Sequence, residues 1–246
     1  MTDAALPAPV PTRLQPGKAL IALRRLLANK EDTVAVFEIM RALNGGSTAK
    51  GYARLLETAQ GGRLAYERAE LTDRLKDTAW LESLPADSLG AAYLAFLRRN
   101  GFTPDGLVET SKVGATPVEQ RHPYAWFGRR TRDAHDLWHI LTGYETDGLG
   151  EACLVAFSFA QTGGLGWALI AFGAWARSMR MGGRAQARSI VEGWRMGRRA
   201  GWLQAEDYDR LLAEPLDAAR RRLKLERPER YLALPPAQRY PEALGA

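Results

Sequence analysis

Cysteine and histidine are scarce in this chain, which has one cysteine and three histidines among its 246 residues. A single cysteine excludes an internal disulfide and is consistent with a reducing compartment. We expect Cys153 to be a small buried hydrophobic residue rather than a metal ligand, because free cysteine usually behaves in this way. With so few histidines, the position of each one carries information.

The sequence also lacks alternating runs of β-branched residues, which are the usual pattern of half-buried strands. Helix-forming Ala, Leu, Arg and Glu dominate instead. No internal repeat and no second core is evident. We therefore predict an all-α fold with a single helical domain over residues 17–228, a flexible N-terminal segment at 1–16 and a C-terminal tail at 229–246.

Helical periodicity and capping residues place most of the predicted helices. Asp32 is a suitable N-cap, and the glycine pairs at 45–46 and 61–62 are expected to end helices. Residues 102–120 show no clear period. The predicted helices cover residues 17–30, 33–43, 49–58, 72–81, 88–99, 185–201 and 206–225.

No apolar stretch of the chain is both long and unbroken. Residues 152–176 contain no charged side chain and would be long enough to span a bilayer. Glycine and polar residues at 161–166 divide the stretch into two parts that are too short to cross, so we predict a buried helical hairpin. Part of it is expected to pack in the core, and Trp167, Ile170 and Phe172 are expected to line a lipid cavity or a membrane-facing entrance.

The charge pattern lacks the marks of a nucleic-acid-binding protein. The net charge is +6, and arginines cluster at 129–132, 195–199 and 220–222 without interleaved aromatic residues or a recognised module. An anionic membrane surface or an anionic small molecule is the expected partner. The N-terminal residues have no apolar core of the secretory type, so we expect a cytoplasmic protein associated peripherally with the inner membrane of a bacterium.

Two of the three histidines lie four residues apart, at His135 and His139, with Asp136 between them. On a helix, side chains at this spacing share one face, so both imidazoles can reach one ion. The third histidine, His122, precedes a proline and is expected to be structural or exposed. Two imidazoles with a neighbouring carboxylate predict a metal site.

Glu151 is the expected fourth member of this site, although it follows His139 by twelve residues. In a continuous helix it would lie roughly 18 Å away along the axis. Gly143, Gly148 and Gly150 interrupt the helix, so Glu151 can begin a second helix and return to the histidines. We therefore predict a glycine-broken helix-loop-helix that binds one divalent metal, zinc first, with iron, manganese or cobalt as alternatives.

The pattern HD-x2-H-x11-E resembles the metal motif of the ubiquinone (coenzyme Q) biosynthesis family typified by the fourth Coq protein. The resemblance covers most of the chain, from about residue 30 to residue 228. Leu165 departs from it, because the family usually has proline there; this affects a local turn and not the ligands. The other matching positions are Asp32-Thr33, Val36-Phe37, Ser88-Leu89-Gly90, Tyr93, Phe96-Leu97, Arg130, Arg132, Gly150-Glu151, Ala160-Gln161-Thr162-Gly163 and Trp194-Arg195-Met196-Gly197.

The resemblance implies a metal-dependent enzyme that removes the C1 carboxylate of a polyprenylated 4-hydroxybenzoate-type intermediate oxidatively and leaves a hydroxyl. In this hypothesis Arg130 or Arg132 holds the carboxylate of the substrate. Asp136 either binds the metal or orients His135. The implied partners are the prenylated intermediate and other ubiquinone biosynthesis enzymes, with a homodimer as one assembly to test.

Two other functions remain open from the sequence. The chain could be a non-catalytic scaffold that binds a prenyl lipid and presents it to other enzymes of the pathway. It could also be a metal phosphohydrolase of the HD type, as His135-Asp136 suggests. That class needs a further histidine upstream, for which His122 is the sole candidate, and a distant aspartate downstream.

Overall fold

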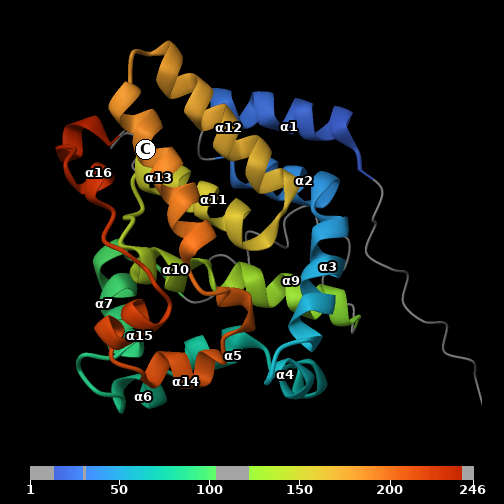
Figure 1. Cartoon of the computed structure of the whole chain (residues 1–246), viewed down its shortest axis with the longest axis vertical. Coiled ribbons are helices and arrows are strands. Elements are labelled where there is room, and N and C mark those ends of the chain that lie inside the picture. Colours follow the sequence, from blue (N-terminus) through green and yellow to red (C-terminus); the bar gives the residue numbers. More distant parts are fainter. Residues whose placement is uncertain (1–13, 30–31, 104–121, 240–246) are drawn as a thin grey trace, which may run out of the picture.

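The computed structural model describes residues 14–29, 32–103 and 122–239. Within these ranges every regular element is a helix, and the one β-type pairing is an isolated bridge between Ser88 and Pro215. The predicted all-α, single-domain fold is therefore confirmed (Figure 1). Parts of the predicted flexible segment (1–13) and of the aperiodic connection (104–120) lie outside the described residues.

Apart from the interval between α7 and α9, the described helices follow one another with short connections (Figure 1). Their bounds are α1 Pro16–Ala28, α2 Thr33–Leu43, α3 Gly45–Leu56, α4 Gly61–Glu67, α5 Leu71–Lys76, α6 Thr78–Glu82, α7 Leu89–Asn100, α9 Pro123–Asp133, α10 His135–Thr142, α11 Gly148–Thr162, α12 Leu165–Arg180, α13 Arg184–Arg199, α14 Tyr208–Ala213, α15 Leu216–Arg222 and α16 Glu229–Leu232. Two short 3-10 turns cover Leu203–Ala205 and Pro236–Gln238.

The central helix is α11, which is buried along most of its length. Helix α13 lies directly against it, because two glycines remove the side chains at the crossing. A Cβ at Gly193 would lie 2.3 Å from the carbonyl oxygen of Cys153, and one at Gly197 would lie 2.7 Å from that of Phe157. Cys153 is fully buried, as predicted. These contacts fix α11, which carries Glu151, within the core.

The predicted hairpin in residues 152–176 is formed by the end of α11 and by α12. Gly163 ends α11 with a φ of +66°, in the left-handed region that glycine adopts without steric cost. The side chain of Asn44, at the end of α2, accepts a hydrogen bond from Gly166 N at 2.8 Å and so holds the start of α12. In the part of the chain that the structure describes, no helix is long and apolar enough to span a membrane.

Helix α2 ends at Leu43, as predicted, but both glycine pairs begin the following helix and do not cap the preceding one. Helix α3 begins at Gly45 instead of at residue 49, and an additional helix, α4, which the sequence pattern did not predict, begins at Gly61. A Cβ at Gly61 would lie 1.6 Å from the carbonyl oxygen of Leu55. Glycine is needed there for close backbone approach, which a termination rule does not consider.

The predicted helices at 72–81 and 206–225 are each divided. Asp77 ends α5 and caps α6 through a hydrogen bond from Trp80 N. Glu214, in an extended conformation, and Pro215 separate α14 from α15. The segment predicted as a tail contains α16, and its Tyr231 and Leu234 are buried in the main hydrophobic core. This segment therefore packs close to the loop that joins α10 to α11.

Candidate metal centre

The two histidines of the motif lie one turn apart on α10. His122 caps the preceding helix α9 by accepting a hydrogen bond from Tyr124 N, and α9 ends at Asp133. Helix α10 then begins at His135. The rings of His135 and His139 lie with their centroids 4.8 Å apart and their planes perpendicular. This is the arrangement expected for residues four apart on one helical face.

Glu151 returns to the histidines because the chain turns sharply after α10. Gly143 ends α10 with a φ of +77°. Asp147 caps α11, since its Oδ1 accepts hydrogen bonds from Leu149 N and Gly150 N at 3.1 and 2.8 Å. Glu151 therefore lies in the first turn of α11. Its Oε1 is 3.1 Å from Nε2 of His139, and its Oε2 is 3.5 Å from Nε2 of His135.

The orientation of His139 leaves one ring nitrogen for a ligand. Its Nδ1–H donates a hydrogen bond to the carbonyl oxygen of Tyr144 at 3.0 Å, because a carbonyl can only accept. Its Nε2 is buried and has no hydrogen-bond partner among the described residues, although the Glu151 carboxylate is near. Metal-binding histidines are commonly oriented through their other nitrogen in this way.

The spacing of the three groups fits a small cation. One ligand atom from each of His135, His139 and Glu151 can be chosen so that all lie within 4.8 Å of one another. A tetrahedral zinc ion with bonds of about 2.1 Å separates its ligand atoms by roughly 3.4 Å. The distances from Glu151 Oε1 to His139 Nε2, 3.1 Å, and from Glu151 Oε2 to His135 Nε2, 3.5 Å, are close to that value. The residues present therefore fit the expected ion.

The electrostatics also favour a bound cation. Burial opposes ionisation of Glu151, but the charge of His139 and the hydrogen bond from His135 hold its pKa well below the usual range. Burial likewise opposes protonation of His139, yet the neighbouring Glu151 charge raises its pKa. The cluster thus contains a partly buried carboxylate that stabilises positive charge beside it, and a divalent ion would supply such a charge.

Asp136 lies next to this cluster but is not one of its three members. Burial raises its pKa, while the nearby charges of His135 and His139 oppose that rise. Its role as a fourth ligand or as an orienting group therefore stays a prediction. His122 is not a member either, so the extra histidine that an HD phosphohydrolase requires is not contributed by the described residues.

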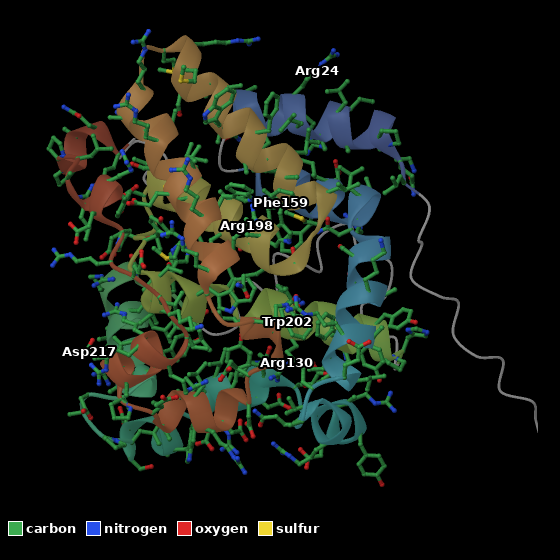
Figure 2. The ribbon with its side chains drawn as sticks, in the orientation of Figure 1. Arg24, Arg130, Phe159, Arg198, Trp202 and Asp217 are labelled. Carbon is green, nitrogen blue, oxygen red and sulfur yellow. The ribbon has the colours of Figure 1, made fainter. Side chains whose placement is uncertain are left out.

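The two arginines predicted to hold a substrate carboxylate are engaged with protein groups. The Arg130 guanidinium is buried, lies over the ring of Tyr208 at 4.7 Å and donates a hydrogen bond to the carbonyl oxygen of Glu206. Burial lowers the pKa of Arg130, and Figure 2 places this residue in the lower half of the molecule, below Trp202. Arg132 donates to Oδ1 of the buried Asp133 at 2.7 Å. Their part in substrate binding stays a prediction.

The three apolar residues predicted to meet a lipid lie along α12 and differ in exposure. Trp167 is half-buried and stacks on His135, with centroids 6.5 Å apart and planes inclined by 9°. Ile170 is half-buried between the main core and the smaller core of α1 and α2. Phe172 is 63% exposed and stacks against Trp175. Helix α12 therefore extends from the candidate metal centre to the protein surface.

Three further residues shape the site and were not identified from the sequence as parts of it. Tyr144 supplies the carbonyl that orients His139, Asp147 caps the helix of Glu151, and Tyr231 donates a hydrogen bond to Asp147 at 2.5 Å. The capping role of Asp147 could have been recognised, because Asp directly before a helix is a common N-cap. The contributions of Tyr144 and Tyr231 depend on backbone geometry and on a contact 84 residues apart in sequence.

The fold and the site define a class of protein: an all-α domain in which two helices and their connecting loop gather two imidazoles and a carboxylate. Residues 14–229 match the family model described as "Coenzyme Q (ubiquinone) biosynthesis protein Coq4". The chain therefore belongs to the Coq4 family of ubiquinone biosynthesis proteins.

Comparisons with individual proteins agree with this assignment. The chain is 30% identical to the mitochondrial ubiquinone biosynthesis protein COQ4 homolog of Rattus norvegicus over 179 residues, which cover 70% of this chain and 63% of the rat protein. The corresponding Danio rerio protein is 31% identical, with 71% and 63% covered. The chain thus spans less than two thirds of these relatives. A crystal structure of a Nostoc punctiforme protein has the same fold, with a TM-score of 0.62, 24% identity and coverage of 87% of this chain and 99% of the other.

Proposed function

We propose that this protein is a metal-dependent enzyme of ubiquinone biosynthesis. Its reaction is the oxidative decarboxylation at C1 of a polyprenylated 4-hydroxybenzoate-type intermediate. The observation that carries the proposal is the cluster of His135, His139 and Glu151 in a chain of the Coq4 family. Formally, the aryl carboxylic acid and one water become a phenol, carbon dioxide, two protons and two electrons. The reaction therefore also needs a two-electron acceptor, such as dioxygen.

In this proposal His135, His139 and Glu151 hold the metal, with Asp136 as a further ligand or orienting group. A bound zinc ion would act as a Lewis acid toward the oxygen atoms of the substrate head group. Tyr144 fixes the ring of His139 through its carbonyl. The side chains of His135 and Glu151 are 19% and 37% exposed, whereas that of His139 is 1% exposed, so the head group is expected to approach from the side of His135 and Glu151.

The prenyl tail is expected to follow α12 away from the metal. A long isoprenoid in water costs about 25 cal/mol per Å² of exposed apolar surface, so the protein must shelter it or work at a bilayer. Trp167 stacks on His135 and Phe172 is exposed further along the same helix, which supports a route from the ring to the surface. This route agrees with a peripheral association with the bacterial inner membrane.

The experiment that tests the metal site is elemental analysis of the purified protein and of its ligand variants. We expect about one divalent ion per chain in the wild type. The double variant His135→Ala/His139→Ala and the single variant Glu151→Ala should each lose it. Asp136→Asn should retain more metal, because its carboxylate is not in the group of three. Undiminished metal in the double histidine variant would show that the site is elsewhere.

Turnover of a prenylated hydroxybenzoate by the metal-loaded protein then separates an enzyme from a scaffold. The proposal expects release of carbon dioxide and formation of the C1 hydroxyl, both abolished in Glu151→Ala. If the loaded protein binds the prenylated ligand but forms no product with any electron acceptor supplied, the non-catalytic scaffold is the better account. The exposed apolar residues of α12 would serve that function as well.

A further inference from the structure

The loop between α10 and α11 holds two of the proposed metal ligands through its own backbone and side chains. Tyr144 O accepts the hydrogen bond from Nδ1 of His139, and the carbonyl of Asp147 accepts one from Glu151 N at 2.9 Å. The carboxylate of Asp147 caps the first turn of α11. A shift of this loop would therefore move His139 and Glu151 relative to each other.

The side chain that anchors this loop comes from the C-terminal segment of the domain. Tyr231, on α16, is fully buried and donates its hydroxyl hydrogen to Oδ2 of Asp147 at 2.5 Å. The same hydroxyl oxygen accepts a hydrogen bond from Glu145 N at 3.3 Å. The Tyr231 hydroxyl thus contacts the loop at two points. Of the two oxygens of the Asp147 carboxylate, Oδ1 caps α11 and Oδ2 accepts the hydrogen bond from Tyr231.

Packing around Tyr231 restricts its position. Its ring meets Tyr144 edge to face, with centroids 5.3 Å apart, and the Arg239 guanidinium lies 4.4 Å over its centre. Two backbone contacts fix the segment itself: Tyr231 N donates to Glu192 on α13, and Arg239 O accepts a hydrogen bond from Leu149 N. Burial and the bond to Asp147 raise the pKa of the Tyr231 hydroxyl, so it remains a donor at neutral pH.

We propose that Tyr231 is a positioning residue of the metal centre, which acts through Asp147 and the loop backbone to hold His139 and Glu151 at metal-binding distance. The inference rests on the proposed function, because it concerns the same site. Tyr231 touches neither ligand directly. Its effect should appear in the affinity of the protein for the metal, because mutation of groups that orient metal ligands commonly lowers that affinity by about 10- to 100-fold.

The test compares Tyr231→Phe with Tyr208→Phe by titrating the apoprotein with Zn²⁺ against a competing chelator. Tyr208 is a matched control, because it is also a buried tyrosine with two hydrogen bonds, to Trp138 and to the carbonyl of Leu203. We expect the dissociation constant for Zn²⁺ to rise on the order of tenfold in Tyr231→Phe and to change much less in Tyr208→Phe. The ligand-field spectrum of bound Co²⁺ should change in Tyr231→Phe alone.

A second variant keeps the proposal testable if Tyr231→Phe does not fold. Asp147→Asn preserves an oxygen that can cap α11 but removes the charge that the Tyr231 hydroxyl meets, so it should also weaken Zn²⁺ binding. Wild-type affinity in a folded Tyr231→Phe, or an equal loss in both tyrosine variants, would overturn the positioning role. A wild-type protein that binds neither Zn²⁺ nor Co²⁺ would instead overturn the proposed metal site, and the positioning role with it.

Discussion

His135 and His139 illustrate how two equivalent residues of a motif acquire different environments. His139 is buried, stacked near Phe96 and fixed through its Nδ1, whereas His135 is partly exposed and faces Trp167. Both project from one helix, so the difference arises from what α7, α12 and the following loop place around them. A substrate of the proposed metal centre is therefore expected to approach from the side of His135.

Arg132 has two candidate roles: it can bind the carboxylate of the substrate, or it can neutralise the charge of Asp133. The Asp133 side chain is 2% exposed, and it accepts hydrogen bonds from Arg132 and from Thr72 Oγ1. Removal of the arginine leaves a buried carboxylate without its cation, which typically costs about 3 kcal/mol or more. We therefore expect Arg132→Ala to lower the free energy of unfolding by about 3 kcal/mol in chemical denaturation, while the metal is retained.

The double variant Arg132→Ala/Asp133→Asn separates the two roles. Removing both charges should restore most of the lost stability, because no unpaired charge remains. If Arg132 also holds the substrate carboxylate, turnover stays low in the double variant. The single variant Arg132→Lys should then retain part of the turnover, because lysine keeps the positive charge but lacks the planar guanidinium that binds a carboxylate through two hydrogen bonds. Full turnover in the double variant would assign Arg132 to structure alone.

At the scale of elements, the loop from Gly143 to Gly150 decides whether two helices make one site. Gly150 lies so close to the start of the loop that a Cβ there would be 1.9 Å from the carbonyl oxygen of Glu145. That oxygen belongs to the backbone and cannot move away without shifting Tyr144, which orients His139. The glycine therefore couples the closure of the loop to the geometry of the ligands.

Gly150→Ala should cost about 3 kcal/mol of stability, the upper end of the usual range for overpacking, and abolish stoichiometric metal binding, because the overlap can be relieved only by backbone movement. The matched control is Gly62→Ala, in the first turn of α4, where no atom lies within 4 Å of the added Cβ. This control should be neutral or stabilising by up to about 1 kcal/mol. Thermal melts and metal analysis of both variants check the prediction. Wild-type metal content in Gly150→Ala would mean that the loop is not essential to the site.

At the scale of the whole molecule, exposed apolar side chains gather on α1 and α12, which lie side by side at one end of the domain (Figure 1). Leu20 and Ile21 on α1 are 48% and 63% exposed, and Phe172 and Met179 on α12 are 63% and 42% exposed. Arginines border them, and Arg24 extends from α1 into solvent (Figure 2). Apolar residues bordered by cations suit an anionic bilayer surface.

Phe172→Glu should weaken sedimentation with anionic vesicles about tenfold or more, since burial of a phenylalanine contributes about 1.5–3 kcal/mol. The control is Tyr66→Glu, a residue that is 87% exposed on α4, and Figure 1 shows this helix at the opposite end of the molecule. It should leave vesicle binding unchanged, and both variants should keep their metal. High salt should reduce wild-type binding because it screens the arginines. Equal binding by Phe172→Glu and wild type would exclude this face.

The sequence by itself determined the local features: the helical class, the shared face of His135 and His139, the break after α10 and the helical hairpin that turns at Gly163. Each depends on periodicity or on backbone preferences of nearby residues, and none of them needs distant contacts. The sequence pattern failed at Gly61, where the same residue type serves close backbone approach instead of helix termination.

The tertiary structure alone decided which side chains are available for chemistry. Arg130 contacts Glu206 and Tyr208, and Arg132 pairs with Asp133. The hydrogen bond from His139 Nδ1 to the Tyr144 carbonyl leaves Nε2 as the nitrogen that can bind a metal. The segment after residue 228 packs Tyr231 under the loop of the site. Such contacts join residues far apart in the chain, so their pairing follows from how the helices pack and not from any local pattern.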